Sequence, residues 1–112
     1  MLPARERMNR AEFKKFSEHP HKSTLYNRSG TLLSTPSAEI KFSVVTNKKH
    51  EKRATARNTL RRRAYALFGQ SGIVVSGIFY PSKTSYTLPY QTFKQSFCEL
   101  LEKVKKNIPQ NP

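Results

Sequence analysis

The clearest pattern along the chain is an alternation of apolar and polar positions in the segment EIKFSVVTN. Ile40, Phe42, Val44 and Thr46 occupy every second position. A period of two is typical of a β-strand with one face buried and the other exposed. The pattern therefore predicts a strand here, but it does not decide which face would line a binding cleft.

Other periodicities predict the remaining elements. Phe13 and Phe16 lie three residues apart after a capping residue, Asn9, which is typical of a short first helix. The segment GIVVSGIFY is rich in β-branched residues and halts at Pro81, which predicts a buried strand. The order along the chain is a helix over about 9–18, short strands joined by turns near Asn27 to Gly30 and at Pro36, the alternating strand, a helix over 52–68 that ends before Gly69, a strand over 73–80 and a helix over about 89–107.

This order, α-β-β-β-α-β-α, predicts an α+β fold in which helices pack on one small sheet as a two-layer sandwich. A chain of 112 residues has room for a single modest core. We therefore expect one domain over residues 1–108 and a short tail over 109–112.

The helix predicted over 52–68 is apolar along one side and cationic along the other. Leu60 and Ala64 mark the apolar side. On a helical wheel with roughly 100° per residue, the roughly 140° next to this apolar side carries guanidinium groups, an amide and an aromatic ring. Such groups suit phosphate oxygens, base or sugar edges and a base face. The arc holds Arg57, Arg61, Asn58, Arg62 and Tyr65.

The charge balance indicates a polyanionic partner. The chain has 21 Lys and Arg against 7 Asp and Glu, a net charge of +14 and a sequence pI near 10.4. Residues 41–63 contain nine basic residues and one acid, Glu51. A solvated helix face ordinarily mixes its signs, whereas here neighbours one turn apart are like-charged. We therefore expect this region to bind nucleic acid.

Other function classes receive little support. The longest apolar stretch has nine residues, and the N-terminus MLPARERMNR lacks the apolar region of a secretory signal, so we expect a cytoplasmic protein without a membrane segment. Cys98, the only cysteine, lies at an apolar position of the last predicted helix, so we expect its thiol to pack in the core. The histidines, His19, His21 and His50, lie in polar stretches and read as exposed. No motif of a protein active site or metal site is present.

The segment FSVVTNKKHEKRATARNTLRRRAY resembles the central motif of the bacterial ribonuclease P protein component. In that family a strand ends in Ser-Lys-Lys, and the next helix opens with Arg-Asn-Arg and continues with pairs of Lys or Arg. LPARERMNRAEFKKF and LPYQTF are similar to the family's opening segment and to the start of its last helix. The residues matching the central motif are Asn47-Lys48-Lys49, Arg57-Asn58-Thr59 and Arg61-Arg62.

The resemblance implies a ribosomal-protein-S5 domain 2-like sandwich with a left-handed β-α-β crossover at the basic helix, an exception to the usual handedness. It also implies the accessory protein subunit of an endoribonuclease whose RNA performs the catalysis. That RNA uses bound Mg²⁺ to release the 5′ leader from precursor tRNA. The protein would then hold no catalytic residue and no metal, and would bind one ribonuclease P RNA and the precursor tRNA.

The resemblance and the helix wheel together predict two surfaces. The turn before the basic helix and the helix itself would bind the catalytic RNA. A cleft between the first helix and the sheet would bind the single-stranded leader, because aromatic stacking tolerates any base. A core role fits Phe16 and Phe42 as well. The predicted residues are Lys48, Lys52, Arg53, Arg57, Asn58, Arg61, Arg62 and Tyr65 for the catalytic RNA, and Phe13, Phe16, Phe42, Asn47 and Lys49 for the leader.

Three positions depart from the family pattern. Thr59 replaces the third residue of Arg-Asn-Arg, which would remove one phosphate contact. Asn47 replaces a serine, a small polar exchange. Tyr80 stands before Pro81 where the family commonly has arginine, so that stacking would replace a charge.

Two other functions fit the basic helix. A ribosomal or other structural RNA-binding protein without a role in catalysis would use the same side chains. A DNA-binding protein would lay this helix in the major groove, although no short helix precedes it as in a helix-turn-helix. Only a ribonuclease P subunit should stimulate a ribonuclease P RNA at low Mg²⁺, which distinguishes it from a structural RNA-binding protein. Competition between folded RNA and duplex DNA distinguishes it from a DNA-binding protein.

Overall fold

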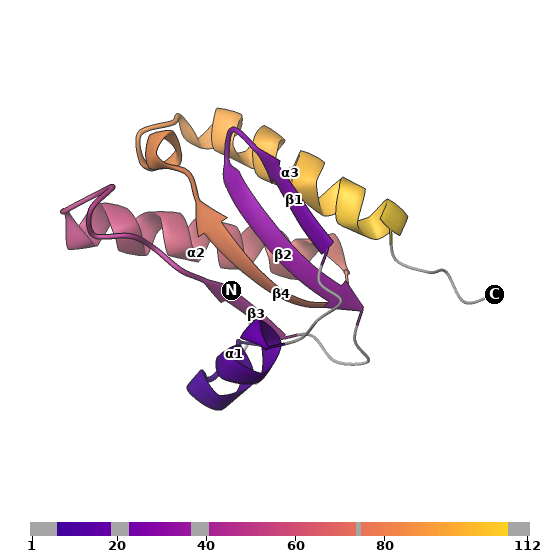
Figure 1. The fold of residues 1–112 in the computed structure, drawn as a ribbon. Coiled ribbons are helices and arrows are strands. Elements are labelled where there is room, and N and C mark those ends of the chain that lie inside the picture. The colour runs from indigo at the N-terminus through magenta and orange to yellow at the C-terminus, as the bar shows by residue number, and fades with distance from the viewer. Residues whose placement is uncertain (1–6, 19–22, 37–40, 74, 108–112) are drawn as a thin grey trace.

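The computed structural model describes residues 7–18, 23–36, 41–73 and 75–107 of the chain (Figure 1). The predicted order of helices and strands is confirmed, and a 3₁₀ helix, η2, occupies part of the loop after the last strand. The expected tail over 109–112 lies outside the described residues. The elements are α1 (Arg10–Ser17), β1 (Ser23–Asn27), β2 (Gly30–Pro36), β3 (Lys41–Val44), α2 (Ala54–Ser71), β4 (Val75–Pro81), η2 (Lys83–Tyr86) and α3 (Tyr90–Asn107).

The four strands form one sheet in the order β1-β2-β4-β3. β1, β2 and β4 are antiparallel neighbours, whereas β3 runs parallel to β4. A parallel pair needs a crossover connection, and α2 provides it. When Figure 1 is turned so that β3 and β4 point upward, α2 passes behind the sheet and β4 lies to the right of β3, so the crossover is left-handed.

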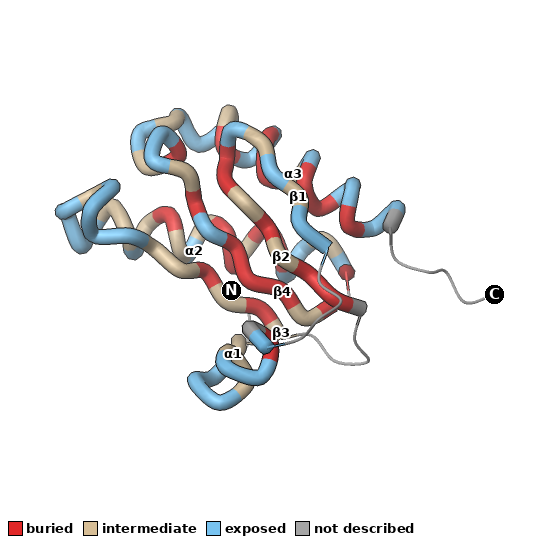
Figure 2. Tube along the Cα trace, viewed as in Figure 1, coloured by how far each residue is buried: buried red, intermediate tan, exposed pale blue. Residues whose placement is uncertain are grey.

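The main core lies between the sheet and the two long helices, α2 and α3, which cover the same face (Figures 1 and 2). Phenylalanine rings dominate it. Phe42 on β3 stacks on Phe68 of α2 with centroids 4.0 Å apart, and Phe79 on β4 meets Phe97 of α3 edge-on at 4.7 Å. The core residues are Leu32, Phe42, Val44, Leu60, Ala64, Tyr65, Leu67, Phe68, Ile73, Val75, Phe79, Phe93, Phe97, Leu100, Leu101 and Val104.

α1 packs on the opposite face of the sheet, at its β3 edge (Figure 1). Asn9 caps this helix as predicted: its Oδ1 accepts a hydrogen bond from Glu12 N at 2.8 Å, and the Glu12 carboxylate accepts one from Asn9 N at 3.0 Å. The other carboxylate oxygen of Glu12 lies 2.9 Å from Lys41 Nζ on β3. Met8 N also donates to Phe42 O at 2.9 Å. These contacts fix both the start of α1 and its position beside β3.

Three details differ from the sequence-based expectations. α2 continues through Gly69 and ends at Gly72, whose φ of 74° is the left-handed conformation that commonly terminates a helix. The alternating strand is shorter than predicted, and Ile40 lies outside the described residues. Cys98 packs against the core but keeps partial exposure, and this burial raises the pKa of its thiol. Among the described residues, no helix is both long and apolar enough to cross a membrane.

Candidate nucleic-acid interface

The turn between β3 and α2 is ordered around Asn47. Its Oδ1 accepts a hydrogen bond from Lys49 N at 2.8 Å, and its carbonyl oxygen accepts bonds from His50 N and Glu51 N at 3.1 Å. Asn47 N in turn donates to the hydroxyl of Tyr86 on η2 at 2.9 Å. The asparagine that replaces the family's serine thus supplies the acceptor that closes the turn. The exposed lysines of this turn therefore project from a defined backbone.

Glu51, the single acid of this basic region, is neutralised by Arg53. The carboxylate accepts bonds from Arg53 Nε at 2.9 Å and Arg53 Nη2 at 3.1 Å, the paired geometry that arginine favours. Hydrogen bonds from the Arg53 side chain and backbone lower the pKa of Glu51 to about 2. The Arg53 side chain remains 68% exposed. A phosphate approaching the turn therefore meets a cationic surface.

The cationic side of α2 divides along two lines. Asn58 and Arg62 are exposed, whereas Arg57 and Arg61 are half-buried. Arg61 Nη2 donates to Thr46 Oγ1 at 2.8 Å, which turns its guanidinium toward the end of β3. The predicted residues that the structure leaves exposed on the turn and helix are Lys48, Lys52, Arg53, Asn58 and Arg62.

The prediction that Tyr65 contacts RNA is wrong. Its side chain is 8% exposed, its ring packs edge-on against Phe42 at 5.7 Å, and its hydroxyl accepts a bond from Val44 N at 3.4 Å. On the helical wheel Tyr65 falls among the cationic residues. In the structure, however, α2 packs so close to β3 that the strand also buries Tyr65, beside the apolar stripe of the helix. Tyr65 therefore contributes to the core.

Thr59, which replaces an arginine of the family motif, presents no free donor outward. Its hydroxyl donates to Thr55 O at 2.9 Å, one turn earlier in α2. One turn later, the guanidinium of Arg63 lies over the ring of Tyr90 on α3, 4.9 Å from its centroid. This arginine therefore lies on the α3 side of the helix, away from Arg61.

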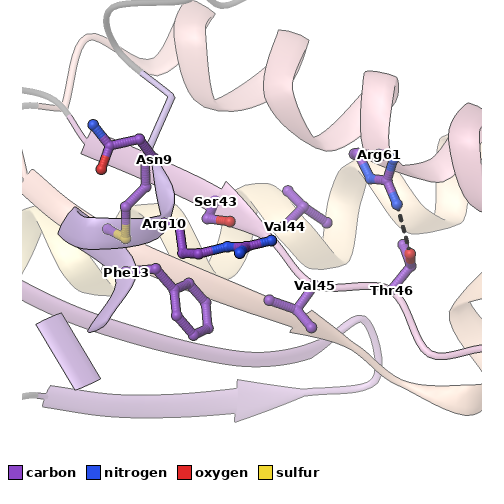
Figure 3. A pocket seen from close by; sticks show the side chains of 9 residues that line it. Asn9, Arg10, Phe13, Ser43, Val44, Val45, Thr46 and Arg61 are labelled. Atoms are coloured by element: carbon purple, nitrogen blue, oxygen red, sulfur yellow. Dashed lines mark hydrogen bonds between the residues drawn. The ribbon is translucent and has the colours of Figure 1, made fainter. Parts of the chain in front are cut away.

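A cleft lies where α1, the end of β3 and α2 meet, and we call it the α1 cleft (Figure 3). Its volume is about 410 Å³. Arg10 and Phe13 reach into it from α1, beside Val45, and Arg61 reaches Thr46 from the α2 side (Figure 3). It therefore combines an aromatic ring with two guanidinium groups. The lining residues are Met8, Asn9, Arg10, Phe13, Ser43, Val44, Val45, Thr46 and Arg61.

Of the residues predicted for the leader, only Phe13 lines the α1 cleft. The prediction for Phe42 is wrong, because its ring is 0% exposed on the core face of β3. Phe16 is 5% exposed, which leaves no ring face for a base. Asn47 and Lys49 are exposed in the turn, one to three residues beyond the part of the chain that lines the cleft.

Two of the cleft residues that the sequence did not predict lie on the face of β3 opposite to Phe42. Ser43 and Val45 alternate with Phe42, so they point toward α1 when Phe42 points into the core. Arg10 precedes Phe13 by three residues and therefore lies on the same side of α1. The alternation contained this information, but the choice of face required the position of α1.

Comparisons with known proteins identify the family. A family model described as ribonuclease P matches residues 2–105. A ribonuclease P protein of Staphylococcus aureus, a mutant with defective mRNA degradation activity, superimposes with a TM-score of 0.78 at 15% identity, over 90% of this chain and 89% of that chain. Another S. aureus structure gives 0.75 at 19% identity over 89% and 95%, and the protein from Thermotoga maritima gives 0.68 at 19% over 84% and 91%.

A search of curated protein sequences finds no match. The structural likenesses, all below 25% identity, establish the fold, which agrees with the architecture that the sequence resemblance implied. The family model spans α1 to α3 and includes the basic turn, α2 and the α1 cleft. The chain therefore belongs to the ribonuclease P protein family.

Proposed function

We propose that the chain performs its part in tRNA 5′-end maturation, which its family membership establishes, by binding a catalytic RNA through the turn and outer side of α2. The observation that carries this proposal is the cationic surface of the turn and α2, in which the one acid, Glu51, is paired with Arg53. Phosphate contacts of this kind supply a large share of the affinity of proteins for nucleic acid. The residues proposed for this contact are Lys48, Lys52, Arg53, Arg57, Asn58, Arg61 and Arg62.

We propose that the α1 cleft holds the single-stranded 5′ leader of precursor tRNA. The Phe13 ring offers a stacking surface to any base, while Arg10 and Arg61 reach the phosphates on either side of it. Arg61 lies at the border of the cleft and the cationic side of α2. Catalytic RNA and leader would therefore meet at this arginine, which would orient the cleavage site relative to the RNA.

Cleavage itself is proposed to be performed by the RNA with Mg²⁺ that the RNA holds. Mg²⁺ is bound by oxygen ligands arranged octahedrally. Within the described part of the chain, no three His, Cys, Asp or Glu side chains lie together, and Glu12 and Glu51 are each paired with a cation. The described side chains therefore offer no set of ligands for a protein-held ion. We propose one protein per RNA, acting in the cytoplasm with the precursor tRNA.

Reconstitution tests this function. The protein is added to a bacterial ribonuclease P RNA at low Mg²⁺, and cleavage of precursor tRNA is measured. We expect cleavage to be restored, because cationic side chains replace part of the Mg²⁺ that folds and docks the RNA. The double variant Arg57→Ala/Arg62→Ala should restore it poorly, whereas Lys103→Ala/Lys106→Ala on α3, with the same loss of charge, should act like the wild type. Absence of stimulation by the wild type would indicate a structural RNA-binding role instead.

A further inference from the structure

Three residues form a row across the sheet on the face opposite the main core. Tyr26 on β1 lies directly opposite Thr31 on β2, which lies directly opposite Tyr80 on β4. Their neighbours along the strands, Leu32 and Phe79, belong to the core. Since side chains alternate between the two faces, the row points away from the core. Two aromatic rings thus project from the same face, separated by one small hydroxyl side chain.

This row lies at the end of the sheet that α1 leaves open. At the β3 edge, the ion pair between Glu12 and Lys41 holds α1 over the sheet. Tyr26 is 75% exposed and Tyr80 is 37% exposed. None of the described helices crosses β1, β2 or β4 on the face turned to the viewer (Figures 1 and 2).

The row continues the α1 cleft. Val44 lies opposite Phe79 in the parallel pair of β3 and β4, and Val45 N donates to Phe79 O at 2.9 Å. Val45, which lines the α1 cleft, therefore lies beside Tyr80. Neighbouring strands are about 4.8 Å apart, so the backbone positions of Tyr80 and Tyr26 are about 10 Å apart. A chain leaving the cleft reaches Tyr80 first and Tyr26 next.

Hydrogen bonds hold the backbone beneath the row. Asn27 Nδ2 donates to Ser96 O on α3 at 2.6 Å, which anchors β1 immediately after Tyr26. Ser82 N donates to Ser29 O at 3.0 Å, and Ser82 Oγ donates to Arg28 O at 2.5 Å, which ties the β1–β2 turn to the end of β4. The same contacts place the exposed side chains of Arg28 and Lys83 at this end of the sheet.

We propose that Tyr26 and Tyr80 form a second stacking platform, on which unpaired bases of the 5′ leader lie after the leader leaves the α1 cleft. The inference rests on the proposed function of that cleft. Aromatic rings on an open sheet face are a common means of binding single-stranded RNA. The nearby Arg28 and Lys83 supply charge for the phosphates. A second copy of the chain is a poorer occupant, because two chains of net charge +14 repel each other.

Substrates with two leader lengths test the platform. One precursor tRNA has a leader that ends within the α1 cleft, and the other has a leader long enough to cross to β1. Dissociation constants are measured for the reconstituted complex with Tyr26→Thr and Tyr80→Thr, since threonine preserves the strand. We expect each variant to bind the long-leader substrate roughly fivefold or more weakly and the short-leader substrate unchanged.

Matched variants decide between explanations. Tyr26→Phe and Tyr80→Phe should bind like the wild type, because the ring is kept; a loss equal to that of the threonine variants would overturn stacking. Thr24→Ala, exposed on the same face of β1, should have no effect. Equal weakening for both leader lengths would overturn the platform, as would self-association of the wild type that Tyr26→Thr abolishes. If Phe13→Ala also fails to discriminate substrates with and without a leader, the proposed cleft function fails; if it does discriminate, only the platform fails.

Discussion

Arg61 on α2 donates a hydrogen bond to Thr46 Oγ1 at the end of β3, 2.8 Å away, and its guanidinium lines the α1 cleft. From the sequence alone, Arg61 is expected to bind the catalytic RNA and a separate group of side chains to line the cleft. In the structure the two surfaces share this arginine. Under the proposed function, contacts with the catalytic RNA and with the leader would be coupled at this position.

The first prediction compares Arg61→Ala with Arg62→Ala. Arg62 is exposed on α2 and does not line the α1 cleft. Its loss should therefore weaken RNA assembly for every substrate and reduce the magnitude of the slope of log affinity against log salt by about one. Loss of Arg61 should do the same and also reduce the preference for a substrate with a leader. The salt dependence of binding, measured with precursor and mature tRNA, checks both. Identical behaviour of the two variants would place Arg61 on the helix surface only.

The second prediction concerns Phe13. Phe13→Ala should reduce affinity for precursor tRNA by roughly 1–3 kcal/mol for each base stack lost, with little change for mature tRNA, which has no leader. Binding titrations with the two RNAs provide the measurement. A cooperative thermal transition must first show that the variant is folded. Equal losses for both RNAs would remove Phe13 from leader binding.

The third prediction separates Phe42 from Phe13. Phe42 is fully buried and stacks on Phe68, so Phe42→Ala leaves a cavity between β3 and α2. We expect a loss of about 3–5 kcal/mol in the free energy of unfolding, measured by urea denaturation. In the fraction that remains folded, discrimination between leader and no leader should persist. A stable Phe42→Ala protein that loses this discrimination would return Phe42 to the cleft.

The sequence predicted the elements well because each has a strong local signal. Asn9 followed by Glu12 forms a complete capping box, and the apolar stripe of α3 matches the core residues Phe93, Phe97 and Leu100. The end of α2 was predicted less well. Gly69 predicts an end to the helix, but a glycine inside a helix costs only about 1 kcal/mol, and the left-handed φ at Gly72 ends α2.

The site was predicted only in part, because its residues are brought together by tertiary packing. Alternation shows that Phe42 and Val45 point to opposite faces of β3, but only the packing of α1 and α2 shows which face forms a cleft. The helix wheel likewise assumed a narrow buried stripe, whereas β3 also covers Tyr65. The row of Tyr26 and Tyr80 depends on strand register, which neither strand reveals alone.

The fourth prediction concerns Gly30 at the start of β2. Its φ is 147°, and a Cβ at this position would lie 2.2 Å from Tyr80 O and 2.9 Å from Pro81 Cα. Gly30→Ala should therefore force β2 away from β4, disturb the pairing of Thr31 with Tyr80 and lower the melting temperature. Gly72→Ala is the matched control, because its φ is also positive but nothing lies within 4 Å. A Gly30→Ala protein as stable as Gly72→Ala would contradict the close approach.

The fifth prediction concerns the pH dependence of the turn before α2. Arg53 holds the pKa of Glu51 at about 2, below its usual value of 4.5. A depressed carboxyl pKa stabilises the folded state above the usual pKa, so this contribution is complete above about pH 4.5 and is lost as the pH falls toward 2.

In Arg53→Ala, NMR titration should find the Glu51 pKa raised toward 4.5. The carboxylate, no longer paired with a cation, would then face the RNA phosphates at neutral pH, so this variant should lose more RNA affinity than Lys52→Ala, which removes the same charge next to it. The double variant Glu51→Gln/Arg53→Ala should recover part of that loss. If Glu51→Gln instead gives no recovery and the pKa of Glu51 is unchanged in Arg53→Ala, the pair does not control the charge of the turn.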